Sequence, residues 1–235
     1  MEKYTATVRG VTPLNDQVKL FRLEFEKPFE FQAGQFVILN ITDADGNPQR
    51  RSYSIASSPK NKDYIELCIK IVSNGRVSSI MGQLQEGANI ELDGPYGKFT
   101  VDKEQKKELL LIAAGVGIAP IRSLVLDLCE TGYSQAVSLF FGFRYMNDCL
   151  FKDECLKLKQ EFPNFNFYPI ISRPEEDSEN WMDVGHVNAV LPKYVNNAEG
   201  KEVYICGSLP MVKDVVSALE EIGFNREQIR TDAWG

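Results

Sequence analysis

The sequence contains little histidine and no clustered cysteine. Among its 235 residues there is one histidine, His186, and there are five cysteines without a C-x-x-C pair. A single histidine excludes catalysis by a histidine pair and a zinc centre built from several histidines. The cysteine spacing fits neither a structural zinc site nor an iron–sulfur cluster, so we expect reduced and mostly buried thiols. We expect His186 to have a structural or helix-capping role.

Long apolar runs and an excess of basic charge are also missing. No apolar run approaches the roughly 20 residues that span a bilayer, and the polar start MEKYTATVRG has no signal-peptide core. We therefore expect a cytoplasmic protein without a membrane span. The formal net charge of −7 argues against a nucleic-acid partner, because binding along a phosphate backbone requires clustered Lys and Arg.

The first hundred residues alternate between apolar and polar side chains, which is the period of half-buried strands. Lys19–Glu26 and Tyr64–Val72 show this alternation, and Gln35–Ile41 is a further strand candidate. Short strands at this spacing, with little helix between them, predict an all-β antiparallel Greek-key barrel that is closed or nearly closed. One helix is expected within this half, over Val77–Leu84.

After about Asp102, candidate strands alternate with candidate helices. The expected strands are Leu109–Ala114, Val137–Phe141, Phe165–Ile171, Val203–Cys206 and Ile229–Trp234. The expected helices are Ile121–Cys129, Lys152–Phe162 and Met211–Ile222. This alternation predicts an α/β Rossmann-like domain with a parallel sheet and right-handed crossovers. With the charged stretch Asp102–Glu108 as the boundary, we expect two domains, at residues 1–102 and 103–235.

The stretch Leu109–Pro120, LLLIAAGVGIAP, combines a strand buried on both faces, a glycine-rich turn and the start of a helix. Backbone N–H groups at such a helix start can bind an anion. The turn is also an imperfect dinucleotide fingerprint. It has Gly115-x-Gly117, but Pro120 stands at the third glycine position, and the next strand ends in Gly-Phe-Arg rather than in an acidic residue. A plain βα turn is the alternative interpretation.

Four strands of the second half are followed by small or polar residues: Gly115, Gly142, Ser172 and Gly207. Ligands of open α/β sheets bind at the carboxyl ends of the strands, so these residues predict a rim that faces a dinucleotide. Arg144 and Arg173 each follow a strand end and could meet its phosphates, or they could be ordinary solvated arginines.

Arg51-Ser52-Tyr53-Ser54 is the most informative stretch of the first half. Strand alternation places Arg51 and Tyr53 on one face and Ser52 and Ser54 on the other. By itself this pattern is also compatible with a plain edge strand.

Four ordered motifs together resemble the ferredoxin–NADP reductase superfamily of flavin reductases. The Arg-x-Tyr-Ser motif of that superfamily matches residues 51–54, and its Gly-x-Gly-Ile-Ala-Pro loop matches Gly115–Pro120. Its Gly-Pro-x-Gly-x-Phe turn matches Gly94–Phe99, and its Cys-Gly strand end with a nearby Met matches Cys206, Gly207 and Met211. These motifs cover nearly the whole chain.

The resemblance implies that the barrel half binds FAD. A flavin ring needs an aromatic neighbour for its flat face and a hydrogen-bonding group at its edge, and Tyr53 and Ser54 are suited to these roles. Arg51 can bind the pyrophosphate through two parallel hydrogen bonds. Without the resemblance, Gly75–Ser79 would be an ordinary capped helix start. The expected FAD-binding residues are Arg51, Ser52, Tyr53, Ser54, Ile69, Gly75, Val77, Ser78 and Ser79.

The resemblance also implies that the α/β half binds a nicotinamide dinucleotide, NADH or NADPH. The expected contacts are Gly115, Val116, Gly117, Arg144, Arg173, Cys206, Gly207, Met211 and Trp234. Ser54, Cys206 and Trp234 are the expected catalytic residues. By family likeness Ser54 lies at the flavin edge, Cys206 beside the nicotinamide and Trp234 over the flavin face. Two positions depart from the family pattern: Val116 replaces a frequent threonine, and Ser208-Leu209 stand where proline is common.

The expected function is that of an NAD(P)H-dependent, FAD-containing reductase. Hydride would pass from NAD(P)H to FAD held between the barrel and the α/β half. Electrons would then leave for a small molecule or for a protein such as a ferredoxin, a flavodoxin or an oxygenase component. Two alternatives remain: a reductase that uses free flavin as a diffusible substrate, and an electron-transfer subunit that is active only within a complex.

Overall fold

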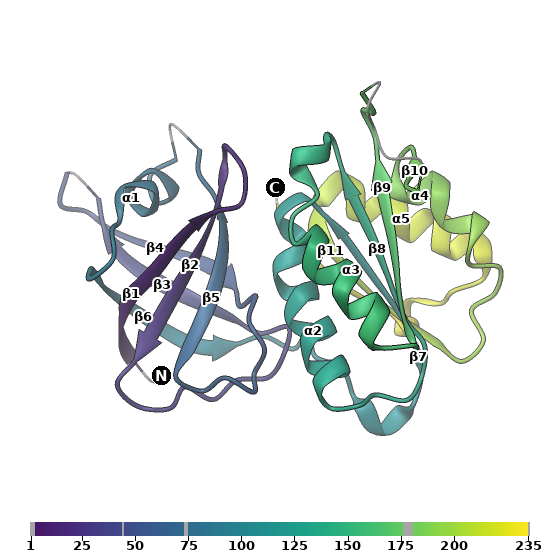
Figure 1. Ribbon diagram of the computed structural model, residues 1–235, viewed down its shortest axis with the longest axis horizontal. Coiled ribbons are helices and arrows are strands. Elements are labelled where there is room, and N and C mark those ends of the chain that lie inside the picture. The colour runs from purple at the N-terminus through teal and green to yellow at the C-terminus, as the bar shows by residue number, and fades with distance from the viewer. Residues whose placement is uncertain (1–2, 44, 73–74, 176–180, 235) are drawn as a thin grey trace. The chain divides into compact units, whose positions relative to one another are not determined.

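The computed structural model describes residues 3–43, 45–72, 75–175 and 181–234 (Figure 1). The chain divides into two compact units. The first contains residues 1–101 and 122–127, and the second contains residues 102–121 and 128–235. Within the described residues, no helix combines the length and the apolar character needed to cross a membrane.

The first unit is built on an antiparallel sheet of six strands in the order β4-β3-β6-β1-β2-β5. An isolated bridge between Ile55 and Leu67 links the end of β4 to β5, so the sheet nearly closes on itself. This confirms the predicted antiparallel barrel, and the position of β6 between β3 and β1 gives it a non-sequential strand order. The strands are β1 (Lys3–Pro13), β2 (Val18–Phe25), β3 (Phe36–Thr42), β4 (Pro48–Ser54), β5 (Tyr64–Lys70) and β6 (Asn89–Tyr96).

The barrel core follows the alternation read from the sequence. In β2, Phe21 and Leu23 are fully buried, whereas Arg22 between them is exposed. β1 and β6 were not among the predicted strands, because each contributes few large apolar side chains to the core. The short helix α1 (Ser78–Gln83) lies inside the range predicted for it and buries Met81 in the same core.

The second unit contains a parallel sheet in the order β10-β9-β8-β7-β11-β12, which confirms the Rossmann-like prediction. Without the edge strand β10, this is the order 3-2-1-4-5 of a doubly wound fold. The strands are β7 (Glu108–Ala114), β8 (Val137–Phe143), β9 (Phe165–Ile171), β10 (Asp183–Val184), β11 (Lys201–Ser208) and β12 (Ile229–Trp234).

Helices cover both faces of this sheet, with α2 and α3 on one face and α4 and α5 on the other (Figure 1). Alternate residues of one strand serve the two faces, and Leu110 and Ile112 pack in the cluster that includes α4 and α5. The helices are α2 (Ile118–Glu130), α3 (Lys152–Glu161), α4 (Val187–Val190) and α5 (Leu209–Ile222). The 3-10 helices are η1 (Lys103–Gln105), η2 (Gly115–Gly117), η3 (Met146–Asp148), η4 (Leu191–Lys193) and η5 (Arg226–Gln228).

Two helices begin earlier than the sequence predicts. α2 starts at Ile118 and α5 at Leu209, so that Pro120 and Pro210 lie in their first turns. A proline is tolerated there because the N–H group that it lacks would have no partner within the helix. His186 occupies the N-cap position of α4, but its side chain makes no capping hydrogen bond, so its capping role is positional only.

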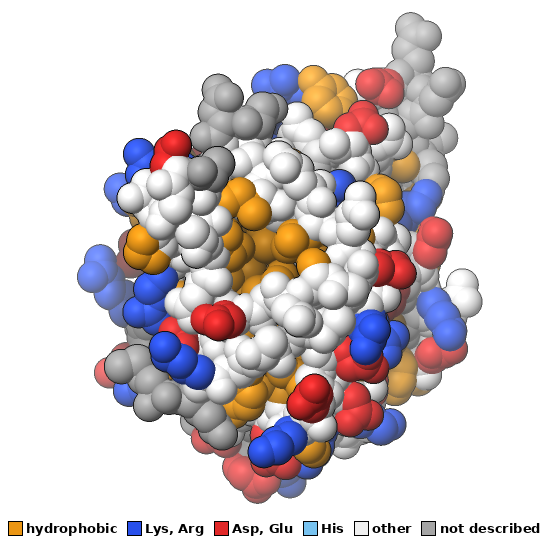
Figure 2. Space-filling view, turned by 90° about the vertical axis from the view of Figure 1, so that its left-hand side faces the viewer, with side chains coloured by type: hydrophobic (Ala, Val, Ile, Leu, Met, Phe, Trp, Pro, Cys, Tyr) orange, Lys and Arg blue, Asp and Glu red, His pale blue; other side chains and the backbone are white. Residues whose placement is uncertain are grey.

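The charges of the barrel unit are balanced, because the first 101 residues contain equal numbers of acidic and basic side chains. The face drawn in Figure 2 shows hydrophobic side chains gathered in a hollow, with charged side chains of both signs around it. The net charge of −7 therefore arises in the remainder of the chain.

All five cysteines are free and buried, as expected. Burial raises the pKa of the Cys68 thiol from its ordinary value of 9.0 to about 12, and likewise raises the pKa of Cys129 from 9.0 to about 12. The folded chain thus holds these protons more tightly than the unfolded chain. This contribution to stability is fully present below pH 9 and is lost as the pH rises towards 12.

We therefore expect the free energy of unfolding to fall when the pH is raised from about 8 to about 10.5 in urea titrations. Cys68→Ala removes one of the titrating thiols, so its stability should fall less steeply over the same range, although it starts lower. Identical pH slopes for the variant and the parent chain would contradict the assignment of the effect to this thiol.

Candidate functional site

The carboxyl ends of the central strands of the α/β unit meet at one edge of the sheet. In the ladders Cys206 pairs with Ala113, Ala114 pairs with Gly142, and Gly142 pairs with Ile170. Because all these strands are parallel, the residues that follow them share that edge, as the sequence predicts. We call this edge the rim, and it comprises the ends of β7, β8, β9, β11 and β12 with the residues directly after them, including the first turn of α5.

The turn η2 lies directly against the end of β11. A Cβ atom on Gly117 would stand 2.2 Å from the carbonyl oxygen of Cys206 and 2.8 Å from Cη2 of Trp234. Only glycine allows this approach, and Gly115 adopts a left-handed φ of +54° that also favours glycine. The structure therefore brings together Gly117, Cys206 and Trp234, which the sequence places far apart.

The thiol of Cys206 is fully buried and donates to Oδ2 of Asp232 on β12, with an S···O distance of 3.8 Å. Burial, followed by the negative charge of Asp232, raises the pKa of this thiol well above its ordinary range. Cys206 is therefore neutral and does not act as a thiolate nucleophile. Asp232 was missed by the sequence analysis. Its spacing of two residues from Trp234 on the same strand is the signal that could have found it.

Two of the predicted arginines lie together at the ends of β8 and β9. The backbone N–H of Arg173 donates to the carbonyl of Arg144 over 3.0 Å. Nη1 of Arg173 also donates to the hydroxyl of Tyr145 over 3.1 Å, and both side chains are exposed. Tyr145 was not predicted, and it orients Arg173. This arrangement can meet the phosphates of a dinucleotide that crosses the rim.

Met211 lies close to Gly207, since a Cβ atom on that glycine would be 2.9 Å from the Met211 sulfur. Val116 is the half-buried central residue of η2. Both residues therefore belong to the rim, beside the turn and the strand end that carry the other predicted contacts.

In the barrel unit, the predicted flavin residues follow one another on β4, which is the first strand in the sheet order. Arg51 and Ser52 are exposed, and Nη1 of Arg51 donates to the carbonyl of Arg50 over 3.0 Å. Tyr53 is half-buried against the barrel core. Burial raises the pKa of its phenol, partly opposed by the charge of Arg51, so the ring is neutral. Ser54 follows at the end of the strand, opposite Phe36.

The segment Gly75–Ser79 forms a tight turn into α1. The Ser79 hydroxyl donates to the carbonyl of Gly75 over 2.5 Å, and the Ser78 hydroxyl accepts from the N–H of Val72 over 3.2 Å. These hydroxyls shape the turn itself. The side chains of Val77 and Ile69 are buried in the barrel core, which leaves only the backbone at these two positions for a ligand.

These groups fit the two cofactors that the sequence suggests. The half-buried ring of Tyr53 can lie against a flat apolar ring system, and the exposed Arg51 can bind a pyrophosphate. The glycine turn offers a surface without side chains, which a dinucleotide can approach closely. Among the described residues, no group of three or more His, Cys, Asp or Glu side chains could hold a metal ion.

Comparison with known proteins finds two domain families in the chain. Residues 5–101 match the family model described as the oxidoreductase FAD-binding domain. Residues 111–217 match the model described as the oxidoreductase NAD-binding domain. The chain belongs to the ferredoxin–NADP reductase superfamily.

Among members of this superfamily, the chain is 31% identical to the phenol hydroxylase P5 protein of Acinetobacter pittii, over 99% of this chain and 65% of that protein. It is also 31% identical to the reductase component DmpP of phenol 2-monooxygenase from a Pseudomonas species, over 93% of this chain and 62% of that protein. The chain thus spans slightly less than two thirds of these relatives. The Amycolatopsis cytochrome P450 reductase GcoB has the same fold, with a TM-score of 0.90 at 24% identity over 99% of this chain and 69% of that chain.

Because the chain contains an NAD-binding domain, the importance of the Gly117 contact can be tested by measuring NAD⁺ affinity. Gly117→Ala should weaken NAD⁺ binding roughly tenfold or more, about 1.4 kcal/mol, because the added methyl pushes the turn away from β11. Isothermal titration with NAD⁺ measures this effect. Gly10→Ala is the control, since a Cβ atom there would meet only Arg22 Cβ at an ordinary 3.7 Å. Unchanged NAD⁺ affinity in the Gly117 variant would exclude the turn from the binding site.

Proposed function

We propose that the protein is an NAD(P)H-dependent FAD reductase that passes electrons to a separate acceptor. FAD supplies the redox chemistry: it takes a hydride from the reduced nicotinamide and releases the electrons singly or as a pair. The work of the polypeptide is to bind and orient the two rings and to exclude water from them. The observation that carries this proposal is the convergence of Gly117, Cys206 and Trp234 at the rim of a chain that also has the barrel of an FAD-binding domain.

The residues of the barrel unit have distinct roles in this proposal. Tyr53 lies against the flat face of the flavin, and Ser54 forms a hydrogen bond at its edge. Arg51 and the backbone of the turn Gly75–Ser79 hold the pyrophosphate. Ser52 and the backbone of Ile69 complete the contacts.

The residues of the α/β unit bind and orient the nicotinamide nucleotide. The backbone of the η2 turn supports it, while Arg144 and Arg173 bind its phosphates. The end of β11 at Cys206 lies beside the nicotinamide ring, and the neutral, buried thiol exchanges no proton with it. Trp234 covers the place that the nicotinamide takes when it reaches the flavin, and it must move aside for hydride transfer. This arrangement serves NADH and NADPH alike.

We infer that the acceptor is an oxygenase component, a ferredoxin or a flavodoxin. Support comes from the names of the relatives, one of which is a reductase component of phenol 2-monooxygenase. The balanced charge of the barrel unit does not repel an acidic acceptor, whereas the acidic remainder of the chain does. Five buried cysteines without disulfides are compatible with the cytoplasm as the site of action.

One experiment separates this function from its alternatives. The purified protein should be yellow, and anaerobic titration with NADH and with NADPH should bleach the flavin band, faster with the preferred nucleotide. A colourless protein that reduces added FMN freely would instead establish a reductase of diffusible flavin. Failure to reduce any artificial acceptor alone, with recovery upon addition of a partner, would establish an obligate subunit.

We expect Arg51→Ala to weaken FAD binding roughly tenfold to hundredfold, because a charge-assisted hydrogen bond contributes about 1.5–3 kcal/mol. Fluorescence titration of the deflavinated protein measures this affinity. Arg9→Ala is the control. Arg9 is an exposed arginine of the same unit whose Nε lies 2.8 Å from Oε2 of Glu24, and surface pairs of this kind contribute little. Equal FAD affinities of the two variants would remove Arg51 from the site.

We expect Trp234→Ala to change the visible flavin spectrum and to lower the KM for the nicotinamide nucleotide roughly tenfold, since the competing ring is gone. Steady-state kinetics with both nucleotides measures the KM. Trp181→Ala is the matched control, because Trp181 is exposed to nearly the same degree, 42% against 41%. An unchanged spectrum together with unchanged nicotinamide kinetics would refute the role of Trp234.

A further inference from the structure

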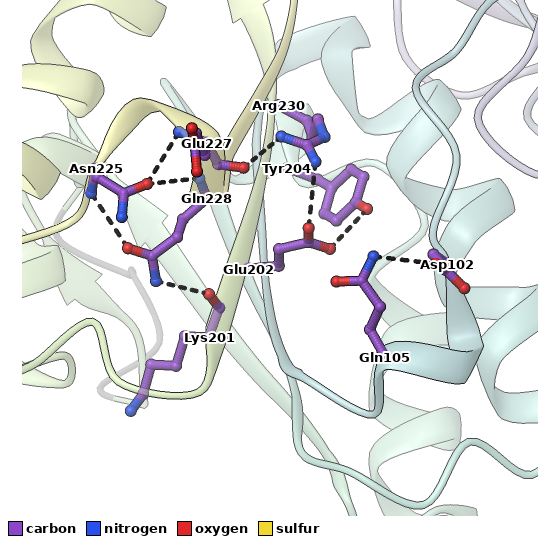
Figure 3. Close-up of polar contacts among 9 residues, drawn as sticks. All are labelled: Asp102, Gln105, Lys201, Glu202, Tyr204, Asn225, Glu227, Gln228 and Arg230. Atoms are coloured by element: carbon purple, nitrogen blue, oxygen red, sulfur yellow. Dashed lines mark hydrogen bonds and ion pairs between the residues drawn. The ribbon is translucent and has the colours of Figure 1, made fainter.

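A polar cluster lies at the opposite edge of the α/β sheet, where β11 and β12 begin (Figure 3). It borders a shallow cavity of about 560 Å³ whose lining includes Gln105, Glu202, Gln228 and Arg230. These side chains are hydrogen-bonded to neighbouring side chains or backbone, for example Gln105 Nε2 to Oδ2 of Asp102 and Gln228 Nε2 to the carbonyls of Ala198 and Lys201. The cluster therefore links the starts of β11 and β12 to nearby segments and is not a ligand site. We call this cluster the brace.

The centre of the brace is a buried carboxylate. Glu202 is only 6% exposed, and its Oε2 accepts from the hydroxyl of Tyr204 over 3.1 Å. Its Oε1 accepts from Nη2 of Arg230 over 3.4 Å. Nη1 of Arg230 also donates to the carbonyl of Glu227 over 2.5 Å. Arg230 thus ties the start of β12 both to β11 and to η5.

Three side chains on one face of β12 contact β11 or the turn η2. β12 is the last strand in the sheet order and pairs with β11 alone. Arg230, Asp232 and Trp234 are spaced by two residues and therefore share a face. Their contacts are, in order, the carboxylate of Glu202, the thiol of Cys206 and the backbone-only surface of Gly117.

These three attachments differ in strength. A thiol that donates over 3.8 Å is a weak hydrogen bond, and the Trp234 contact with Gly117 is a van der Waals contact. The pair of Glu202 and Arg230 joins two charges, one of them buried, and breaking it leaves an uncompensated carboxylate. The β11–β12 ladder sets the register of β12, and of these three contacts the pair of Glu202 and Arg230 adds most to it.

We infer that Glu202 and Arg230 are positioning residues for Trp234, acting through strand β12. Arg230 and Trp234 are four residue steps apart along the strand, a distance of about 13 Å. By holding the strand in register at its start, the pair keeps the indole against the glycine turn at its end. One consequence of the inference rests on the proposed function. The pair determines how easily the nicotinamide displaces Trp234.

The test uses the full chain without nucleotide. Arg230→Met keeps the aliphatic stem and removes the charge, while E202M/R230M removes both charges and leaves no buried carboxylate unpaired. Arg226→Met is the matched control. Arg226 lies in η5, its Nε is 3.7 Å from Oε1 of Glu220, and its side chain is 91% exposed. Amide hydrogen exchange is followed for β12 and, as an internal reference, for the central strand β7.

We expect amide exchange in residues 231–234 to become roughly tenfold faster in both Arg230 variants, with β7 and the Arg226 variant unchanged. In a Trp181→Phe background, Trp234 is the only tryptophan, and iodide should quench its fluorescence more strongly in the Arg230 variants. Arg230→Lys should restore part of the protection. Exchange that rises equally in β7 and β12, or does not rise, overturns the inference, as does unchanged quenching.

Steady-state kinetics test what the inference implies for the proposed function. The Arg230 variants should lower the KM for the nicotinamide nucleotide in the direction expected for Trp234→Ala, with a smaller effect on kcat. A general loss of structure would lower kcat without lowering the KM, and that result counts against a positioning role. Because exchange and quenching are measured without nucleotide, failure of the proposed reductase function would leave those two results intact.

Discussion

The contact between the turn η2 and the end of β11 determines the geometry of the rim. Gly117 lies so close to the carbonyl oxygen of Cys206 that a methyl group in its place would stand 2.2 Å from that oxygen. The approach brings the backbone of the turn, the end of β11 and the indole of Trp234 together, while the Cys206 thiol stays buried. Beside this contact, the exposed Gly115 offers backbone that a pyrophosphate can approach without moving a side chain away.

The protonation states of the candidate site residues are determined by burial more than by nearby charges. The thiol of Cys206 and the phenol of Tyr53 both have raised pKa values because they are partly or fully removed from water, so both stay protonated. Groups of this kind contact and orient cofactors without competing for protons. This fits a protein in which the electron chemistry belongs to FAD and to the nicotinamide, and in which the polypeptide contributes orientation.

Strands β11 and β12 connect a polar cluster at one edge of the sheet to the rim at the other edge. Their amino ends hold a hydrogen-bonded cluster around the buried Glu202, and their carboxyl ends hold the rim with Cys206 and Trp234. A strand transmits position along its length because its register cannot slip by one residue without turning every side chain to the other face. In the positioning role that we infer, the polar attachment at one end of the terminal strand supports the placement of Trp234 at the other.

The sequence by itself determined the two fold classes, the ranges of most strands and helices, and the motifs of both cofactors. Local physics is sufficient for these: a period of two indicates a half-buried strand, and a strand followed by glycines and a helix indicates a parallel nucleotide-binding unit. It missed β1, β6 and β10, whose apolar signal is weak or short. Only the tertiary structure decided that Gly117 packs on Cys206, that Tyr145 orients Arg173, and that Asp232 receives the Cys206 thiol. These contacts depend on strand order and register, which are set by packing between segments far apart in the chain and leave no local pattern in the sequence.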